Sequence, residues 1–344
     1  MFRMGSPAGW SQWAWWWRHW RANTPRHNLL RAAALQALAS SSRHRLDALV
    51  AELHLNFEQA PGALVLLRTA KEFDAVKKAL VTAQQDAHLR LIDANECKRL
   101  EPNLNPAAPL AGALQLPHGN VGNARQLAQQ LRTAAQHLGA RFELDHAVLR
   151  VQPGQQPVIA TARDGDRNFD AVVVCAGAGS AALLRQAGLR LPLRTVTQFA
   201  LTAPLGHVDG QLQTGPLGGV IDARSGVAIA RIGDRVRVTG ASAFTGSGRR
   251  MLPWAMRSLF SALEADYPGA AIGRHAQQWA GRRSRVPDGA PLIGASGLPG
   301  VWLNTAHGPT GWPLACGSAL LLADQMGGHE AADPLTWLGV ERLR

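Results

Sequence analysis

The chain has 344 residues, of which 46% are hydrophobic and 17% are charged, an ordinary balance for a globular protein with room for two domains. No stretch of about 18 uncharged apolar residues occurs, so the sequence predicts no transmembrane helix, and residues 1–27 lack the features of a secretory signal. The cysteines Cys97, Cys175 and Cys316 are widely spaced. They predict neither a disulfide framework nor a metal site, and they favour a reducing, cytoplasmic setting.

The formal net charge of +12 raises the question of nucleic-acid binding. Only four of the 36 basic residues are lysines, and the arginines are scattered singly or in pairs instead of forming a basic tract. Arginine-rich codon usage explains this pattern, and the alternatives are an acidic membrane surface or anionic ligands. The sequence therefore predicts no nucleic-acid partner.

The first 27 residues are rich in tryptophan and arginine. This mixture is typical of a segment that lies at the boundary between lipid and water. It is also typical of a hydrophobic lid or an uncovered interdomain surface, so both interpretations stay open. The segment holds six of the chain's 11 tryptophans with four arginines among them: Trp10, Trp13, Trp15, Trp16, Trp17 and Trp20, with Arg3, Arg18, Arg21 and Arg26.

The next part of the chain predicts alternating helices and strands. Apolar spacing indicates helices over residues 28–53, 72–87 and 93–100, and a further helix that is capped by Asn123 and ends near Leu138. Strands are expected at residues 62–67, 89–92 and 111–116, the last one ending at Pro117. Further β-rich runs occupy residues 141–144, 148–151 and 158–162.

The second half of the chain begins with an apolar run, residues 171–175 (AVVVC), as expected of a strand buried on both faces of a parallel sheet. The predicted fold class is α/β with an additional part built on an antiparallel sheet, and the chain crosses between the two parts. The remaining elements are strands at residues 196–203, 227–232, 236–241, 274–280 and 301–304, and helices from Pro253 to about Tyr267 and from Gly311 to about Gly327.

A glycine turn follows the strand at residues 171–175. Residues 177–182 (GAGSAA) fit G-x-G-x-x-A, in which glycines let the backbone approach a phosphate at a helix N-terminus. The complete pattern also needs an acidic residue about 20 positions on to hold a ribose. No Asp or Glu lies between Ala182 and Val208. The turn is therefore either a secondary dinucleotide contact or a plain link between strand and helix.

A second glycine turn leads into the last helix, at residues 305–312 (TAHGPTGW). Small residues there let the backbone approach a planar ligand, and the helix N-terminus stabilises negative charge on it. His307 is either a structural residue of this turn or a catalytic one. Upstream, Arg282, Arg283 and Arg285 offer guanidinium groups for a carboxylate, or they belong to a solvated basic loop.

These pieces occur in a recognisable order. The segments WAGRR (279–283), PDGAPLIG (287–294), LNTAHG (303–308), GW (311–312) and ACGS (315–318) resemble the C-terminal block of FAD-dependent D-amino-acid dehydrogenases. That family stands within the D-amino-acid oxidase, glycine oxidase and sarcosine oxidase group. Weaker similarity extends back to the tryptophan-rich segment.

The resemblance implies FAD as cofactor and oxidative deamination of a D-amino acid, with hydride passing from the α-carbon to the flavin. The imino acid then hydrolyses to a keto acid and ammonia. Electrons leave to a quinone-type acceptor in the dehydrogenases, which implies peripheral contact with the inner face of the cell membrane, or to oxygen in the oxidases. The implied site has Arg283 on the substrate carboxylate, His307, Gly308, Pro309, Thr310 and Gly311 around the flavin, and Val148, Ala176, Gly177 and Gly179 near the ADP part.

The resemblance also implies a doubly wound FAD-binding domain and a substrate domain with an antiparallel sheet and helices. The FAD-binding part is expected at residues 123–190 and 273–344, and the substrate part at residues 28–122 and 191–272. Residues 1–27 form a separate N-terminal segment.

Two departures from the family pattern change the expectations. Family members begin with a strand, a G-x-G-x-x-G turn and a helix that hold the FAD pyrophosphate, and residues 1–27 contain no such pattern. This predicts an incomplete FAD domain in a truncated sequence that folds poorly and binds FAD weakly. Some relatives place a tyrosine in the substrate pocket, whereas the single tyrosine here is Tyr267 and Ser225 falls near the pocket position. The alternatives are another amine-oxidising flavoenzyme, of glycine or sarcosine oxidase type, and a non-catalytic remnant without FAD.

Overall fold

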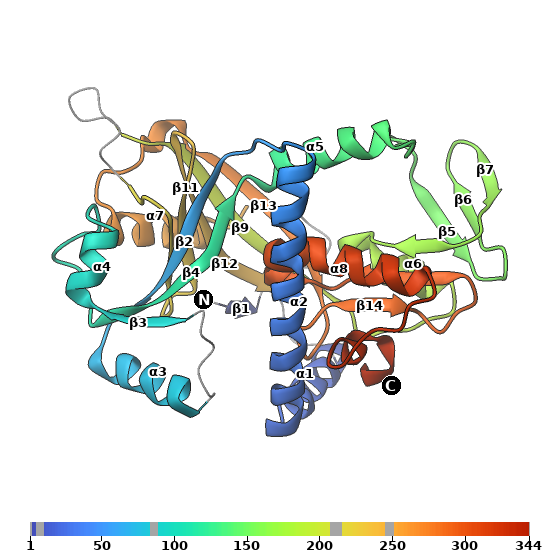
Figure 1. Cartoon of the computed structure of the whole chain (residues 1–344), viewed down its shortest axis with the longest axis horizontal. Helices are drawn as coiled ribbons and strands as arrows, with labels where there is room; N and C mark the ends of the chain where they lie inside the picture. Colours follow the sequence, from blue (N-terminus) through green and yellow to red (C-terminus); the bar gives the residue numbers. More distant parts are fainter. Residues whose placement is uncertain (1, 5–9, 83–88, 207–214, 245–250, 344) are drawn as a thin grey trace.

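The computed structural model describes residues 2–4, 10–82, 89–206, 215–244 and 251–343. Within these residues the chain forms a mixed α/β fold, which confirms the predicted class, with one large sheet and two small ones. Helix α2 (Pro25–Glu52) stands between the large sheet and the part that carries the small sheets (Figure 1).

The large sheet is mostly antiparallel. Its strands run in the order β13-β9-β12-β11-β10-β2-β4-β3, and β1 pairs with β12. The parallel pairing of β10 with β2 joins segments from both halves of the chain in this one sheet. The strands are β1 (Phe2–Met4), β2 (Gln59–Leu67), β3 (Arg90–Asp93), β4 (Gly112–Gly122), β9 (Arg194–Pro204), β10 (Gly219–Asp222), β11 (Val227–Ile232), β12 (Arg235–Phe244) and β13 (Gln277–Arg285).

Helix α7 (Pro253–Asp266) covers one face of this sheet. Phe199 and Leu201 on β9 are fully buried in the same apolar cluster as Leu259 and Leu263 of α7. Side chains alternate along a strand, so Gln198, which directly precedes Phe199, points to the opposite face of the sheet. The sheet therefore separates an apolar core under α7 from a face that is free to carry polar residues.

The small sheets lie on the other side of α2. One of them has the strand order β14-β15-β8. Its strands β15 and β8 are parallel, so they end at the same edge of the sheet. Each continues into a 3-10 turn and a helix: β8 (Val172–Val174) into η1 (Gly177–Gly179) and α6 (Ser180–Gln186), and β15 (Val301–Thr305) into η3 (Gly308–Thr310) and α8 (Gly311–Met326). The other strands are β14 (Leu292–Ala295) and the antiparallel β5 (Val148–Gln152), β6 (Val158–Thr161) and β7 (Gly165–Asn168).

Helix α2 connects the two parts by packing against α8. The contact is close because Gly317 has no side chain: a Cβ there would lie 2.6 Å from the carbonyl oxygen of Leu38, which is itself fully buried. The remaining elements are helices α1 (Trp10–Ala22), α3 (Ala70–Thr82), α4 (Ala94–Leu100) and α5 (Ala124–His137), with the 3-10 turns η2 (Gly273–His275), η4 (Leu335–Leu338) and η5 (Val340–Leu343).

The junction of α1 and α2 holds the turn that follows β13. His19 Nδ1 donates a hydrogen bond to the carbonyl of Pro287, and Arg31 Nη1 donates to the carbonyl of Asp288 across 2.7 Å. The tryptophan-rich segment is thereby fixed to the end of a strand of the large sheet.

Several local predictions were wrong. Residues 141–144 form no strand, because the chain turns at Asp145, whose φ is 62°, and the sheet begins only at Val148. Strand β4 does not end at Pro117, because the pairing with β2 shifts register beside that residue and needs no amide donor from it. The run at 171–175 is shortened to Val172–Val174, and Cys175 is exposed.

The arginine-rich segment is a strand and not a loop. The predicted strand at 274–280 starts later, since residues 273–275 form a 3-10 turn, and it continues through Arg285. Arg282 is exposed, whereas Arg283 and Arg285 are partly buried. The end of the helix predicted at 72–87 falls on residues 83–88, which lie outside the described residues.

Candidate active site

Strand β13 carries the predicted carboxylate-binding residue to the two glycine turns. It contacts both η1 and η3. Arg283 Nη1 donates a hydrogen bond to the carbonyl oxygen of Gly308 across 3.2 Å, so its side chain reaches the turn before α8. A cavity of about 50 Å³ lies at this point, lined by Val196, Gln198, Ser242, Arg283, Arg285, Gly308 and Pro309.

Buried hydroxyl groups fix β13 to both turns. Ser284 Oγ lies 3.4 Å from Thr305 Oγ1, and Thr305 Oγ1 donates to Ser180 Oγ across 3.1 Å. The three side chains are 6%, 2% and 0% exposed, respectively, so they form an internal link between β13, the end of β15 and the start of α6.

Four polar atoms around the cavity and its turn are buried without a hydrogen-bond partner among the described residues. They are Gln198 Oε1, Arg285 Nε, Asn304 Oδ1 and His307 Nε2. Leaving a buried polar group unpaired costs about 1–3 kcal/mol. Gln198 and Arg285 line the cavity, whereas Asn304 lies near the end of β15 and His307 in the turn that follows it. Unpaired polar atoms of this kind are typical of a site that binds a polar ligand.

The electrostatics of the cavity favour an anion. Burial lowers the pKa of Arg283, and the neighbouring charge of Arg237 lowers it further. The pKa of Arg285 is lowered first by burial and then by the charge of Arg31. Within the described part of the chain, neither Arg283 nor Arg285 forms an ion pair. A carboxylate entering the cavity would relieve this uncompensated positive charge.

His307 is neutral at physiological pH. Burial lowers its pKa to about 4. Its carbonyl accepts hydrogen bonds from Thr310 N at 3.0 Å and Thr310 Oγ1 at 2.9 Å, which closes the turn. Gly308 adopts a left-handed φ of 51° at this point. The turn therefore delivers backbone groups and the N-terminus of α8, a source of positive potential, to one place.

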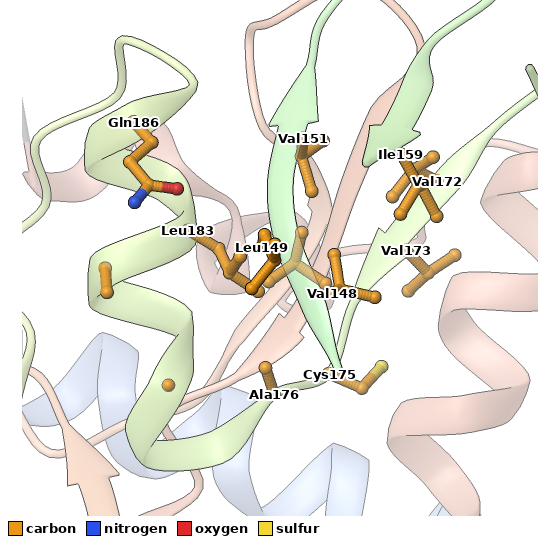
Figure 2. Close-up of a pocket in the computed structure, with 13 residues that line it drawn as sticks. Val148, Leu149, Val151, Ile159, Val172, Val173, Cys175, Ala176, Leu183 and Gln186 are labelled. Carbon is orange, nitrogen blue, oxygen red and sulfur yellow. The ribbon is translucent and has the colours of Figure 1, made fainter. Parts of the chain in front are cut away.

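A second and larger cavity, of about 540 Å³, is an apolar groove between β5, the end of β8 and α6 (Figure 2). Val148, Ala176 and Gly179, which the sequence resemblance assigns to the ADP part of FAD, line it together with Cys175 and Leu183. Gly177 is not among the lining residues, but its φ of 53° starts the turn that shapes the groove. The volume lies in the range of small-molecule sites, which is about 300–1,000 Å³.

Two glycine turns at the carboxyl edge of parallel strands, an apolar groove beside one and a cationic cavity beside the other define a nucleotide-dependent enzyme of the α/β class. The comparison with protein families is more specific. The family model for FAD dependent oxidoreductases (DAO) matches residues 2–325, so the chain belongs to this family.

Relatives and solved structures agree with this assignment. The chain is 34% identical over 309 residues to a D-amino acid dehydrogenase from Rhizorhabdus wittichii, covering 89% of this chain and 73% of the relative. It is 34% identical over 310 residues to one from Cereibacter sphaeroides, covering 89% and 70%. Glycine oxidase from Geobacillus kaustophilus shares the fold, with a TM-score of 0.78, 23% identity and coverage of 90% of this chain and 84% of that one. L-proline dehydrogenase from P. horikoshii also has a TM-score of 0.78, with 17% identity and coverage of 91% and 85%.

The residues present fit FAD at two places. The apolar groove suits an adenine ring, and the unpaired His307 Nε2 and Asn304 Oδ1 beside the turn before α8 suit the polar edge of an isoalloxazine ring. The turn itself has the backbone freedom that a close approach to a planar ring requires, because Gly308 carries no side chain.

Sequence patterns identified Arg283 and the turns, but they missed Gln198 and Ser242. These two residues lie on β9 and β12 and face each other directly in the ladder, a pairing between strands that no local pattern contains. Tyr267 plays no part in the cavity: it is 1% exposed and donates a hydrogen bond to Glu101 Oε2 across 3.2 Å. Ser225 is not a lining residue of the cavity either.

Proposed function

We propose that this protein catalyses the FAD-dependent oxidative deamination of a D-amino acid. The single observation that carries the proposal is the position of Arg283, whose guanidinium group lines the small cavity and reaches Gly308 at the turn before α8. A guanidinium group without an ion-pair partner among the described residues, in contact with the turn proposed to hold the flavin, is suited to bind the carboxylate of an amino acid. The similarity to D-amino acid dehydrogenases supports the choice of substrate class.

The residues of the cavity orient the substrate. Arg283 pairs with its carboxylate, and the unpaired Gln198 Oε1 accepts a hydrogen bond from its amino group. Held by both ends, the α-carbon hydrogen is directed toward Gly308 and Pro309. Bound FAD would supply the acceptor for the hydride that leaves this carbon. No side-chain base is needed when the amine is neutral as the hydride leaves, so positioning and electrostatics are the protein's contribution.

Each of the two glycine turns would hold a different part of FAD. Gly308, Pro309, Thr310 and Gly311 would hold the flavin ring through backbone groups, and the N-terminus of α8 would stabilise negative charge on it. The neutral His307 adds a nitrogen that is still without a partner. Val148, Ala176, Gly177 and Gly179 form the side of the groove that takes the ADP part.

Electrons leave to a quinone-type acceptor at a membrane surface to which the protein binds peripherally. Helix α1 supports this part of the proposal, because Trp13, Trp17 and Trp20 are 67%, 54% and 75% exposed. Helix α1 carries Arg18 and Arg21 and no acidic residue, and the first acidic residue in the sequence is Asp47. An amphipathic aromatic surface with arginines suits an anionic lipid interface. Among the described helices, none is both long enough and apolar enough to span a membrane.

A visible spectrum tests the proposal. The purified chain is incubated with FAD, desalted and examined for flavin bands, and D-alanine is then added without oxygen. Retained bands that bleach with D-alanine and not with L-alanine are the expected result. Retained bands that bleach only with glycine or sarcosine would assign the protein to the other amine oxidisers, and a protein that keeps no flavin would contradict the proposed activity of this chain.

A further inference from the structure

Arg285 is a second cation in the small cavity. It lies two residues after Arg283 on β13, so both side chains project from the same face of the strand, with Cα atoms about 7 Å apart. Both residues line the cavity, together with Gln198 and Ser242. Arg282, which directly precedes Arg283, points to the opposite face of the strand and is exposed.

The charge of Arg285 is not neutralised by the described part of the chain. Its Nε atom is buried without a hydrogen-bond partner. The neighbouring carboxylate, Asp288, is already engaged: its Oδ2 pairs with Arg342 Nε at 2.8 Å, and both side chains are almost fully buried. Its Oδ1 accepts from the amide of Ala290 at 2.9 Å. Asp288 therefore offsets the charge of Arg285 only in part: its charge raises the pKa of Arg285, but burial and the charge of Arg31 lower that pKa more.

Two further arginines add to the positive charge around Arg283 and Arg285. Arg31 lowers the pKa of Arg285, and Arg237 lowers that of Arg283, in both cases after the larger effect of burial. The one α-carboxylate of a simple amino acid pairs with one guanidinium fork. It would leave the other arginine buried and without a counter-charge, which is costly.

We propose that the cavity binds an amino acid with a second carboxylate, Arg283 holding the α-carboxylate and Arg285 the carboxylate of the side chain. The spacing of the two arginines on one strand face matches a substrate of four or five carbons that carries an acid group at each end. This inference rests on the proposed function, since it names the substrate class for the same cavity.

Calorimetric titration of the full chain, saturated with FAD, tests this substrate class without turnover. Glutarate and pentanoate are the probes, since both have five carbons and they differ by one carboxylate. Glutarate is expected to bind at least tenfold more tightly than pentanoate at the same ionic strength. Equal affinities would overturn the inference, and this comparison needs no variant.

Arg285→Gln locates the second contact. The substitution is expected to lower glutarate affinity to that of pentanoate and to leave pentanoate affinity within about twofold of its original value. The matched control is Arg282→Gln, which removes an equal charge from the exposed face of the same strand and keeps the preference for glutarate. A preference for glutarate that survives in Arg285→Gln would overturn the role of Arg285.

The outcome is separable from that of the proposed function. If D-alanine bleaches the flavin but glutarate has no advantage over pentanoate, the second carboxylate site is wrong and the oxidative deamination stands. If glutarate is preferred and neither D-alanine nor D-glutamate bleaches the flavin, the anion site stands and the proposed activity is wrong.

Discussion

Thr305 Oγ1 donates a hydrogen bond to Ser180 Oγ, across 3.1 Å, at the point where both parallel strands have just ended. Thr305 is the last residue of β15, and Ser180 is the first residue of α6, which follows β8. The two residues are 125 positions apart in the chain. This contact sets the distance between the turn at the apolar groove and the turn at the cationic cavity, and so between the two proposed halves of the FAD site.

Thr305→Val is expected to destabilise the protein by about 1–3 kcal/mol, because the hydroxyl groups of Ser180 and Ser284 stay buried and lose their partner. Valine has nearly the same shape, so the effect reports the hydrogen bonds. Urea denaturation measures the loss, and Thr133→Val on the exposed side of α5 is the control, expected to change stability by less than about 0.5 kcal/mol. Equal effects of the two substitutions would mean that the hydroxyl link contributes nothing.

Arg283→Gln is expected to lower kcat/KM for a D-amino acid by at least about thirtyfold, since removing one partner of a buried charge pair costs about 2 kcal/mol or more. Anaerobic flavin reduction by increasing substrate concentrations measures it. Arg282→Gln, on the exposed face of the same strand, should behave like the original protein. Unchanged kinetics in Arg283→Gln would exclude its role in carboxylate binding.

Gln198→Leu is expected to raise KM about tenfold while stability stays the same or increases. The amide oxygen is unpaired and buried, so an apolar side chain of similar size removes a desolvation cost of about 1–3 kcal/mol along with the contact to the substrate amine. Steady-state kinetics measure KM, and thermal unfolding measures stability. If Gln198 had only a structural role, the substitution would lower stability and leave KM unchanged. The control is Gln278→Leu, because Gln278 is exposed on β13.

His307 makes stability depend on pH. Its pKa falls from the ordinary value of 6.5 to about 4 on folding, because burial disfavours the charged ring. The unfolded chain thus binds more protons between these values, and stability is lost as the pH drops from 6.5 toward 4. The loss from this group is at most about 3.5 kcal/mol, since each pKa unit corresponds to roughly 1.4 kcal/mol.

His307→Gln should flatten the unfolding free energy over this pH range, as measured by urea titrations at pH 7, 6 and 5. The control is His275→Gln, because His275 is exposed and its replacement leaves the original slope. The same slope in both variants would place the pH dependence elsewhere in the protein.

Trp13→Ser, Trp17→Ser and Trp20→Ser, combined in one variant, are expected to weaken binding to anionic vesicles at least tenfold. Co-sedimentation at low and high salt measures it, and the remaining binding should be more salt-sensitive because only arginines then contribute. Val81→Ser with Leu138→Ser removes exposed apolar residues from other helices and is the matched control. A protein that stays in the supernatant at low salt would contradict the membrane contact itself.

Predictions from the sequence were most successful for features that depend on the residues of a single helix or strand. The cap Asn123, whose side chain accepts from Gln126 N, and the long helix α2 follow from local chemistry. The predictions failed for features that depend on pairing with another strand. The arginines of β13 look like a loop in isolation, and only pairing of the whole strand with β9 makes Arg283 and Arg285 neighbours on one face. The division of the chain into domain segments stays a prediction.

The candidate site shows the same limit. The turn with Gly308 is readable because glycine spacing and the following helix are local. Gln198 and Ser242 carry no local signal, and their importance arises from a ladder position and from atoms left without partners. Polar residues on the site face of a predicted antiparallel sheet are the one signal that would have pointed to them.

The contacts of His19 and Arg31 with the carbonyls of Pro287 and Asp288 have a consequence for regulation. They place the exposed tryptophans of α1 and the cation Arg285 on either side of a single turn. If α1 docks to a membrane as proposed and shifts in doing so, the shift would be passed through this turn to β13, the strand proposed to hold the substrate. Docking and substrate binding would then change each other's affinity by the same factor.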